Sequence, residues 1–200
     1  MNEVFLKTYK DISLNRREVF RYMSCKKPDA STEKLLDLCF EESKSELSYR
    51  VCYSVFDISF FDGSIDLGFA KTESNALAVN LKSCRKIIAF AATVGHRFDR
   101  LIKREALISP AKALCLQALG SERVESLCDV FNDEMRAAYA DAGFKLKPRF
   151  SPGYGDLSLE LQKYLLPALD CSKLLGISLG DNLMMSPSKS VTAIIGICDK

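Results

Sequence analysis

The sequence predicts a single α+β domain over residues 1–200, with a mainly antiparallel, twisted sheet flanked by helices. Several stretches alternate apolar and polar residues with the two-residue period of strands. Other stretches place apolar residues at helical spacing, and the order of the two kinds favours an antiparallel sheet. A length of 200 residues fits one domain, and no internal repeat or linker divides the chain.

The first half of the chain mixes short helices with strands. Asn15 is a candidate cap for a helix that begins near residue 14, and turn residues at 28–32 precede a longer helix. Phe61-Asp62-Gly63-Ser64 has the composition of a turn between two strands. The expected strands are residues 49–56, 65–69 and 86–94. The expected helices are 15–23, 32–44 and 75–80.

The second half is mostly helical. Residues 97–142 carry an apolar stripe that includes Leu127 and Phe131, and we expect breaks at Ser109-Pro110 and Gly120-Ser121. The later elements expected are a loop at 147–156, a helix at 157–168 that Pro167 ends or kinks, and strands at 182–186 and 191–198 joined by residues 187–190.

Composition and charge exclude several classes of function. Lys and Arg total 28 against 26 Asp and Glu, and no basic run is concentrated enough to predict a nucleic-acid partner. No apolar stretch approaches the roughly 18 residues of a membrane helix, and the first residues do not form a signal peptide. We therefore expect a cytoplasmic protein that does not bind membranes, with reduced cysteines.

Motifs for metal binding and for acid–base catalysis are missing from the sequence. The eight cysteines form no CxxC pair and there is one histidine, so we predict no metal site. Paired catalytic carboxylates, a nucleophile beside a histidine and a phosphate-binding loop are not evident, so no catalytic residue is predicted.

Two segments contain candidate binding residues. In the first, Arg149-Phe-Ser-Pro-Gly-Tyr-Gly-Asp156, the two glycines allow close approach of the backbone to a ligand, and Arg149 offers a planar cation suited to a carboxylate. The alternative is a rigid connector in which Arg149 pairs with a surface acid. In the second segment, 184–196, small polar residues lead into a β-branched strand, and its alternative is an ordinary hairpin turn.

Taken together, the two segments resemble the C-terminal activation domain of cobalamin-dependent methionine synthase. The resemblance rests on Arg149-x-x-Pro152-Gly153-Tyr154, a following helix, a Met-rich strand and the turn 187–191, and it is firmest over residues 120–197. It implies S-adenosylmethionine binding, with Arg149 on the methionine carboxylate and Glu125 on the ammonium group. A surface glutamate is the alternative for Glu125.

The resemblance also implies roles for further residues. Those implied for S-adenosylmethionine are Arg149, Glu125, Phe150, Ser151, Pro152, Gly153, Tyr154 and Asn15, and those implied to face the corrinoid are Tyr154, Ser188, Lys189 and Ser190. Asn15 is neutral where the family has an acidic residue. After Tyr154 the sequence Gly155-Asp156 departs from the family pattern.

The function implied is reactivation of a cobalamin carried by a separate methionine synthase, because the chain is too short to contain cobalamin-binding modules. Oxidised cobalt would first be reduced by one electron from flavodoxin or another electron donor. The reduced cobalt would then take the methyl group of S-adenosylmethionine. Three alternatives stay open: reactivation of another corrinoid methyltransferase, a non-catalytic adaptor that docks on a corrinoid protein, and a small-molecule sensor.

Overall fold

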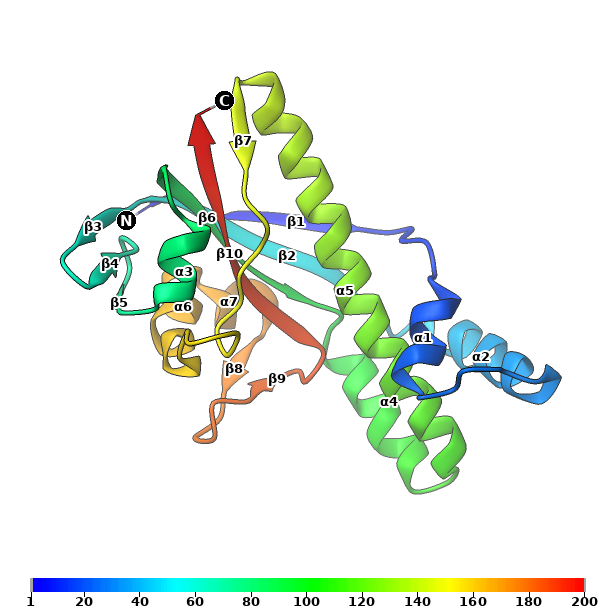
Figure 1. Cartoon of the computed structure of the whole chain (residues 1–200). Helices are drawn as coiled ribbons and strands as arrows, with labels where there is room; N and C mark the ends of the chain where they lie inside the picture. Colours follow the sequence, from blue (N-terminus) through cyan, green and yellow to red (C-terminus); the bar gives the residue numbers. More distant parts are fainter. Residues whose placement is uncertain (1, 200) are drawn as a thin grey trace.

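A curled antiparallel sheet forms the centre of the protein. The computed structural model describes residues 2–199 (Figure 1). Five strands lie in the order β1-β2-β6-β10-β7, and each pairs antiparallel with its neighbours. Their bounds are Phe5–Tyr9, Tyr49–Asp57, Cys84–Thr93, Ser190–Asp199 and Phe144–Leu146 in that order. The predicted α+β class and antiparallel sheet are confirmed.

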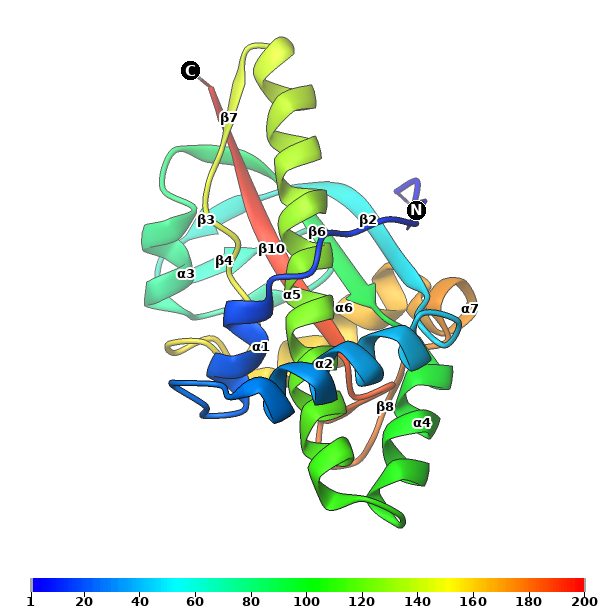
Figure 2. The same cartoon turned by 90° about the vertical axis from the view of Figure 1, so that its right-hand side faces the viewer.

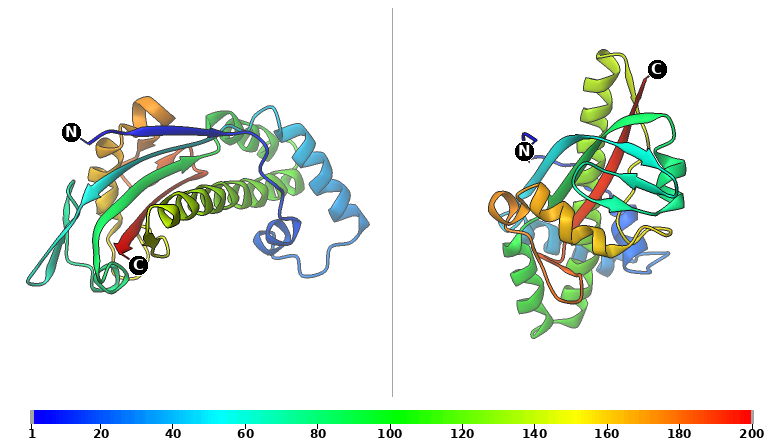
Figure 3. Two further views of the ribbon diagram at one scale, coloured as in Figure 1. Left: turned by 90° about the horizontal axis from the view of Figure 1, so that it is seen from above. Right: turned by 90° about the vertical axis from the view of Figure 1, so that its left-hand side faces the viewer.

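The long helix α5, Pro110–Asp141, covers the concave face of the sheet (Figure 3). Alternate strand residues such as Ile88, Phe90 and Ile195 pack against the predicted stripe of Leu127 and Phe131. Helices α1 (Arg16–Tyr22), α2 (Ala30–Ser43) and α4 (His96–Ala106) pack against α5 (Figure 2).

The opposite face of the sheet carries a second apolar core. Residues of β2, β6 and β10 that alternate with those of the first core meet short helices there. These helices are α3 (Asn75–Asn80), the 3₁₀ turn η1 (Leu159–Leu161), α6 (Gln162–Ala168) and α7 (Cys171–Leu175). Two small sheets complete this side: β3 (Ser59–Phe61), β4 (Ser64–Asp66) and β5 (Lys71–Thr72), then β8 (Ser178–Leu179) and β9 (Met185–Ser186).

Helix α5 runs through the break that the sequence predicts at Gly120-Ser121, so that prediction is wrong. Gly120 is buried, and a Cβ added there would lie 2.4 Å from Cε1 of Phe98 on α4. Glycine is therefore present because α4 approaches closely, and not because the helix ends. The other break is confirmed, since Ser109 caps α5 and Pro110 is its first residue.

Several strand predictions need correction. The expected strand at 65–69 is the short β4, which pairs with β3 and β5 and not with the main sheet. The expected strand at 182–186 is reduced to β9, which pairs with β8, so the turn before β10 is not a hairpin between neighbouring strands. Strands β1, β3, β5, β7 and β8 and helix α7 were not predicted.

The cysteines are also not all free thiols. Cys84 of β6 and Cys198 of β10 form a disulfide, which corrects the expectation of reduced cysteines at these two positions. Cys52 and Cys171 stay unbonded, with their sulfurs 3.6 Å apart. No helix within residues 2–199 combines the length and apolar character needed to cross a membrane.

Candidate functional site

A pocket of about 380 Å³ lies between α1, the middle of α5 and the loop that follows β7. It brings together Asn15, Glu125 and Arg149, which the sequence analysis selected from positions far apart in the chain. The other lining residues are Glu18, Arg21, Tyr22, Glu122, Ser126 and Asp129. The volume falls within the usual range for small-molecule sites.

Arg149 is held between two carboxylates of α5. Its Nη2 atom lies 2.6 Å from Oε2 of Glu125 and 3.3 Å from Oδ1 of Asp129. The two acids are four residues apart, so they point from successive turns of the same helix face. Burial raises the pKa of Asp129 from its ordinary value. Arg149 thus pairs with acidic residues, as the alternative interpretation of this segment expected, and these acidic residues line a pocket.

Asn15 enters the pocket wall through its role as a helix cap. Its side-chain oxygen accepts a hydrogen bond from the Glu18 backbone N–H at 3.3 Å, which confirms the predicted cap of α1. Its own backbone N–H donates to Oε1 of Glu122 at 2.9 Å. Asn15 therefore shapes the pocket without adding a negative charge.

A buried ion pair on α5 fixes the chain just before α1. Arg123 is fully buried, and its guanidinium donates to Glu122 and, at 2.7 Å each, to the carbonyls of Ile12 and Ser13. Sequence reasoning missed this pair. The signal was Arg123 itself, because it lies four residues before Leu127 on the predicted buried stripe and a buried arginine requires partners.

The loop after Arg149 is bound to the sheet edge. Phe150 exchanges both backbone hydrogen bonds with Ile194 of β10, each at 2.8 Å. The Phe150 backbone is thus used within the fold, and its ring is buried in the second apolar core, which leaves the residues beyond it for any ligand. Gly153 has φ +87°, in the region that favours glycine, and exposed Tyr154 rests edge-on against Phe150 with ring centroids 5.4 Å apart.

Asp156 caps a different helix from the one expected. The sequence suggested that it caps the helix that follows it, but its carboxylate accepts from the Ser74 hydroxyl and from the backbone N–H of Asn75 and Ala76, at the start of α3. The Ser74 hydrogen bond, with these backbone donors, lowers the pKa of Asp156. The loop is consequently attached at one end to β10 and at the other to α3.

The turn at 187–190 lies against α4 and the first half of α5. The Ser188 backbone N–H donates to Asp99 at 2.5 Å, and Nζ of Lys189 donates to the Ser121 hydroxyl at 3.0 Å. Burial lowers the pKa of Lys189. Ser121 is one helical turn before Glu125, so the turn and the Arg149 pocket follow the same face of α5.

The fold and pocket define an α+β domain with a charged pocket beside the edge of its sheet. A solved structure with this fold is the crystal structure of the MetH reactivation domain bound to AdoHcy, at a TM-score of 0.71 and 15% identity. The match covers 98% of this chain and 78% of that one, and it confirms the motif-based resemblance at the level of the fold.

Comparison of the sequence with known protein families finds no match. Comparison with curated proteins finds none either. The likeness to the reactivation domain is thus one of three-dimensional structure.

Proposed function

We propose that this chain binds S-adenosylmethionine and presents its methyl group to a cobalamin carried by a separate methionine synthase. The observation that carries the proposal is the pocket in which Arg149, Glu125 and Asp129 meet, within a fold shared with an AdoHcy-bound domain. AdoHcy is the thioether that remains when S-adenosylmethionine has lost its methyl group, so the two share all their other binding groups.

The charged groups of the pocket are complementary to an α-amino acid. A guanidinium recognises a carboxylate through two parallel hydrogen bonds, and carboxylates accept from an ammonium group. When the ligand carboxylate pairs with Arg149, Glu125 and Asp129 become available for the ammonium group. Asp129 supplies the negative charge that Asn15 lacks.

The overall charge of the lining also suits the sulfonium of S-adenosylmethionine. The acidic residues that line the pocket are Glu18, Glu122, Glu125 and Asp129, and the basic ones are Arg21 and Arg149. Since Arg123 neutralises Glu122, a surplus of one carboxylate remains. A surplus of carboxylates attracts a cationic ligand more than the neutral thioether of AdoHcy. In this arrangement Ser151, Pro152 and Gly153 follow the adenosine portion, and Phe150, whose backbone and ring are both engaged within the fold, holds the loop in place.

The chemistry needs orientation more than proton transfer. Bound S-adenosylmethionine would supply an electrophilic methyl on a good leaving group, so the protein has to position it and does not have to protonate it. Exposed Tyr154 and the turn residues Ser188, Lys189 and Ser190 are proposed to face the corrinoid of the partner. The partner would also receive electrons from flavodoxin or a similar donor.

Calorimetric titration of S-adenosylmethionine into the purified chain tests the proposal. Arg149→Ala and Glu125→Ala should each weaken binding by about 1 kcal/mol or more, because each removes a charge-assisted hydrogen bond. Arg97→Ala is the matched control, since Arg97 also pairs with a glutamate (Nε to Glu46 Oε2, 2.9 Å) but lies outside this pocket.

Two results would reject the proposed site. One is saturable binding that Arg149→Ala leaves unchanged. The other is no binding either by the chain alone or after addition of a cobalamin-loaded methionine synthase that lacks its own reactivation domain. In the second case, co-purification of the chain with that partner would favour the adaptor function.

A further inference from the structure

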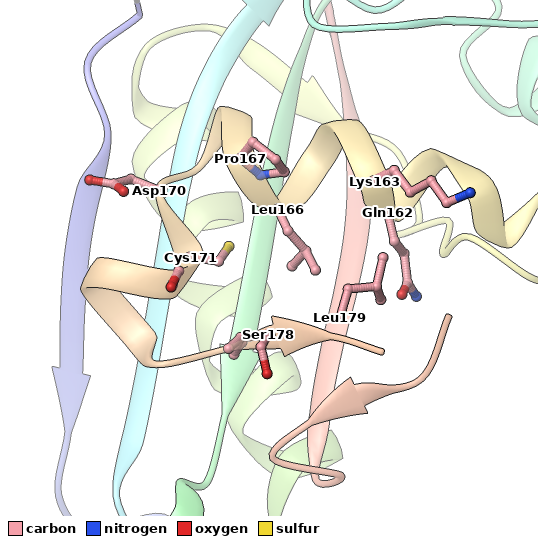
Figure 4. Close-up of a pocket in the computed structure, with 10 residues that line it drawn as sticks. Gln162, Lys163, Leu166, Pro167, Asp170, Cys171, Ser178 and Leu179 are labelled. Carbon is pink, nitrogen blue, oxygen red and sulfur yellow. The ribbon is translucent and has the colours of Figure 1, made fainter. Parts of the chain in front are cut away.

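Strand β1 leaves one edge of the central sheet open. It is the last strand of the sheet and pairs with β2 alone. Figure 4 looks onto the face of the sheet that carries α6 and α7, and it shows β1 as the outermost strand, pale violet at the left. Phe5 is 40% exposed and Leu6 is 48% exposed. Because neighbouring strand residues point to opposite faces, the described part of the chain covers neither face at this edge. An open apolar edge is a site for pairing with another strand.

The backbone groups of Leu6 and Thr8 point away from the sheet. The N–H and C=O groups along a strand point alternately to its two sides. The Ile58 N–H, just after β2, donates to the Arg85 carbonyl of β6 at 3.0 Å, so the even-numbered residues of β2 face β6 and the odd-numbered ones face β1. Phe5 and the other odd-numbered residues of β1 lie opposite odd-numbered residues of β2 and therefore point to β2. Leu6 and Thr8 alternate with them and present their backbone groups at the open edge.

The segment before β1 continues along β2. The Asn2 side-chain amide donates to the Val55 carbonyl at 2.7 Å. The Ser54 hydroxyl donates to the Glu3 carbonyl, also at 2.7 Å. Residues 2–8 therefore form one stretch along the open edge.

This stretch is complementary to itself in the antiparallel direction. When Phe5 lies opposite Phe5 of a second copy, Val4 lies opposite Leu6, and this apolar pair occurs twice. In the same register Glu3 lies opposite Lys7, also twice. Apolar pairs and pairs of opposite charge across two strands are stabilising. A register shifted by two residues, with Leu6 opposite Leu6, places Lys7 opposite Phe5 and loses both charge pairs.

The charged groups are available for this pairing. Glu3 is exposed. Lys7 donates to Glu134 of α5 at 2.5 Å, and an ammonium group has three donors. Lys7 can therefore keep Glu134 and also pair with Glu3 of a second copy.

We propose that two copies of this chain associate through β1, antiparallel and about a two-fold axis at Phe5, so that the central sheet continues from one copy into the other. Val4 and Leu6 of the two copies exchange backbone hydrogen bonds in this arrangement. The Arg149 loop joins β10, on the far side of β6 and β2 from β1. The inference is therefore independent of the S-adenosylmethionine site.

Cysteine substitution tests both the contact and its register. Phe5 and its copy form a non-hydrogen-bonded pair, in which the Cα atoms are about 4.5 Å apart, within the range for a disulfide. Phe5→Cys should therefore give a covalent dimer with oxidised glutathione, seen on a non-reducing gel. Leu6→Cys is the matched control, because Leu6 is similarly exposed but lies opposite Val4 and not opposite itself. The unsubstituted chain shows any background from Cys25, a partly exposed free thiol.

Sedimentation equilibrium tests the association without a covalent bond. The average mass should approach that of two copies as the concentration rises. Glu3→Lys sets lysine opposite Lys7 twice and should raise the dissociation constant of the dimer about tenfold. Glu73→Lys makes the same change of charge at an exposed position beside Ser74, which starts α3 and bonds to Asp156 of the Arg149 loop, and it should leave the constant unchanged.

Any of three results would overturn the proposal. The first is a chain that sediments as a monomer at every concentration. The second is an equal effect of Glu3→Lys and Glu73→Lys on the dissociation constant. The third is a Leu6→Cys variant that cross-links as well as Phe5→Cys does.

Discussion

The Glu122–Arg123 pair offers the sharpest test of how the Arg149 pocket is built. We expect Arg123→Met to destabilise the protein strongly, although methionine is apolar and of similar length. Arg123 is fully buried and Glu122 is 2% exposed, so removal of the guanidinium leaves a carboxylate inside the protein. The donors left to that carboxylate are the Asn15 backbone N–H at 2.9 Å and the Ser126 hydroxyl at 2.7 Å.

The magnitude follows from which groups lose their partners. Removing one member of a buried ion pair typically costs about 3–5 kcal/mol, because the other charge stays buried without compensation. Replacing both members with apolar residues is often close to neutral. The double variant Glu122→Leu/Arg123→Met should therefore recover most of the loss. Its binding of S-adenosylmethionine should stay weak, because Asn15 loses its attachment to α5.

Urea denaturation of the single and double variants provides the free energies of unfolding. Arg97→Ala serves as the exposed control, and its loss should stay below about 1 kcal/mol because surface ion pairs contribute little. A loss of less than about 1 kcal/mol in Arg123→Met would refute the reasoning. So would a double variant whose loss equals the sum of the two single losses, since the pair would then have no coupling.

Three other predictions concern packing, pH and salt. Gly120→Ala should lower the free energy of unfolding, measured by urea denaturation, by about 1–3 kcal/mol. The alanine Cβ would lie 2.4 Å from Cε1 of buried Phe98, and this clash outweighs the better helix propensity of alanine. An unchanged stability would contradict this. The lowered pKa of Asp156 stabilises the folded protein in full above the ordinary pKa of 3.8, and this contribution is lost as the pH falls from there through the lowered pKa of the folded state. Thermal melts should therefore show a smaller acid-induced loss in Asp156→Asn. An equal loss would exclude the cap as the source. Calorimetry should show that S-adenosylmethionine binds more tightly than AdoHcy. This difference in affinity should shrink at high salt, because salt screens the lining carboxylates. A difference in affinity that does not depend on salt would exclude the electrostatic origin.

The elements that could be predicted from the sequence are those whose buried residues follow one another, or recur at a fixed period, along the chain. Strand β6 and the stripe of α5 bury consecutive or periodic apolar residues, so local pattern is sufficient for them. Strand β1 was missed because it is an edge strand: it pairs with β2 alone, and Phe5 and Leu6 are exposed. The false break at Gly120 has the opposite cause, because a contact with α4 that is distant in sequence determines that residue.

The candidate site divides in the same way. Arg149 and Glu125 were found because they belong to motifs that resemble a known family. Asp129 and the buried Glu122–Arg123 pair belong to no such motif, and they become visible when α5 places them beside Arg149 and the start of α1. A fold is needed to bring together charges that are 20 or more residues apart in the chain.

The position of β10 bears on how the protein is made by the ribosome. This strand, Ser190–Asp199, pairs with β6 along nearly its whole length and also receives Phe150 and β7 at its other side. Until residues 190–199 have left the ribosomal exit tunnel, β6 has a long unpaired edge and the Arg149 loop has no strand to join. An exposed apolar edge of this kind favours aggregation. Nascent chains that stall before residue 190 are therefore expected to depend on chaperones, and the pocket can form only after this strand has left the tunnel.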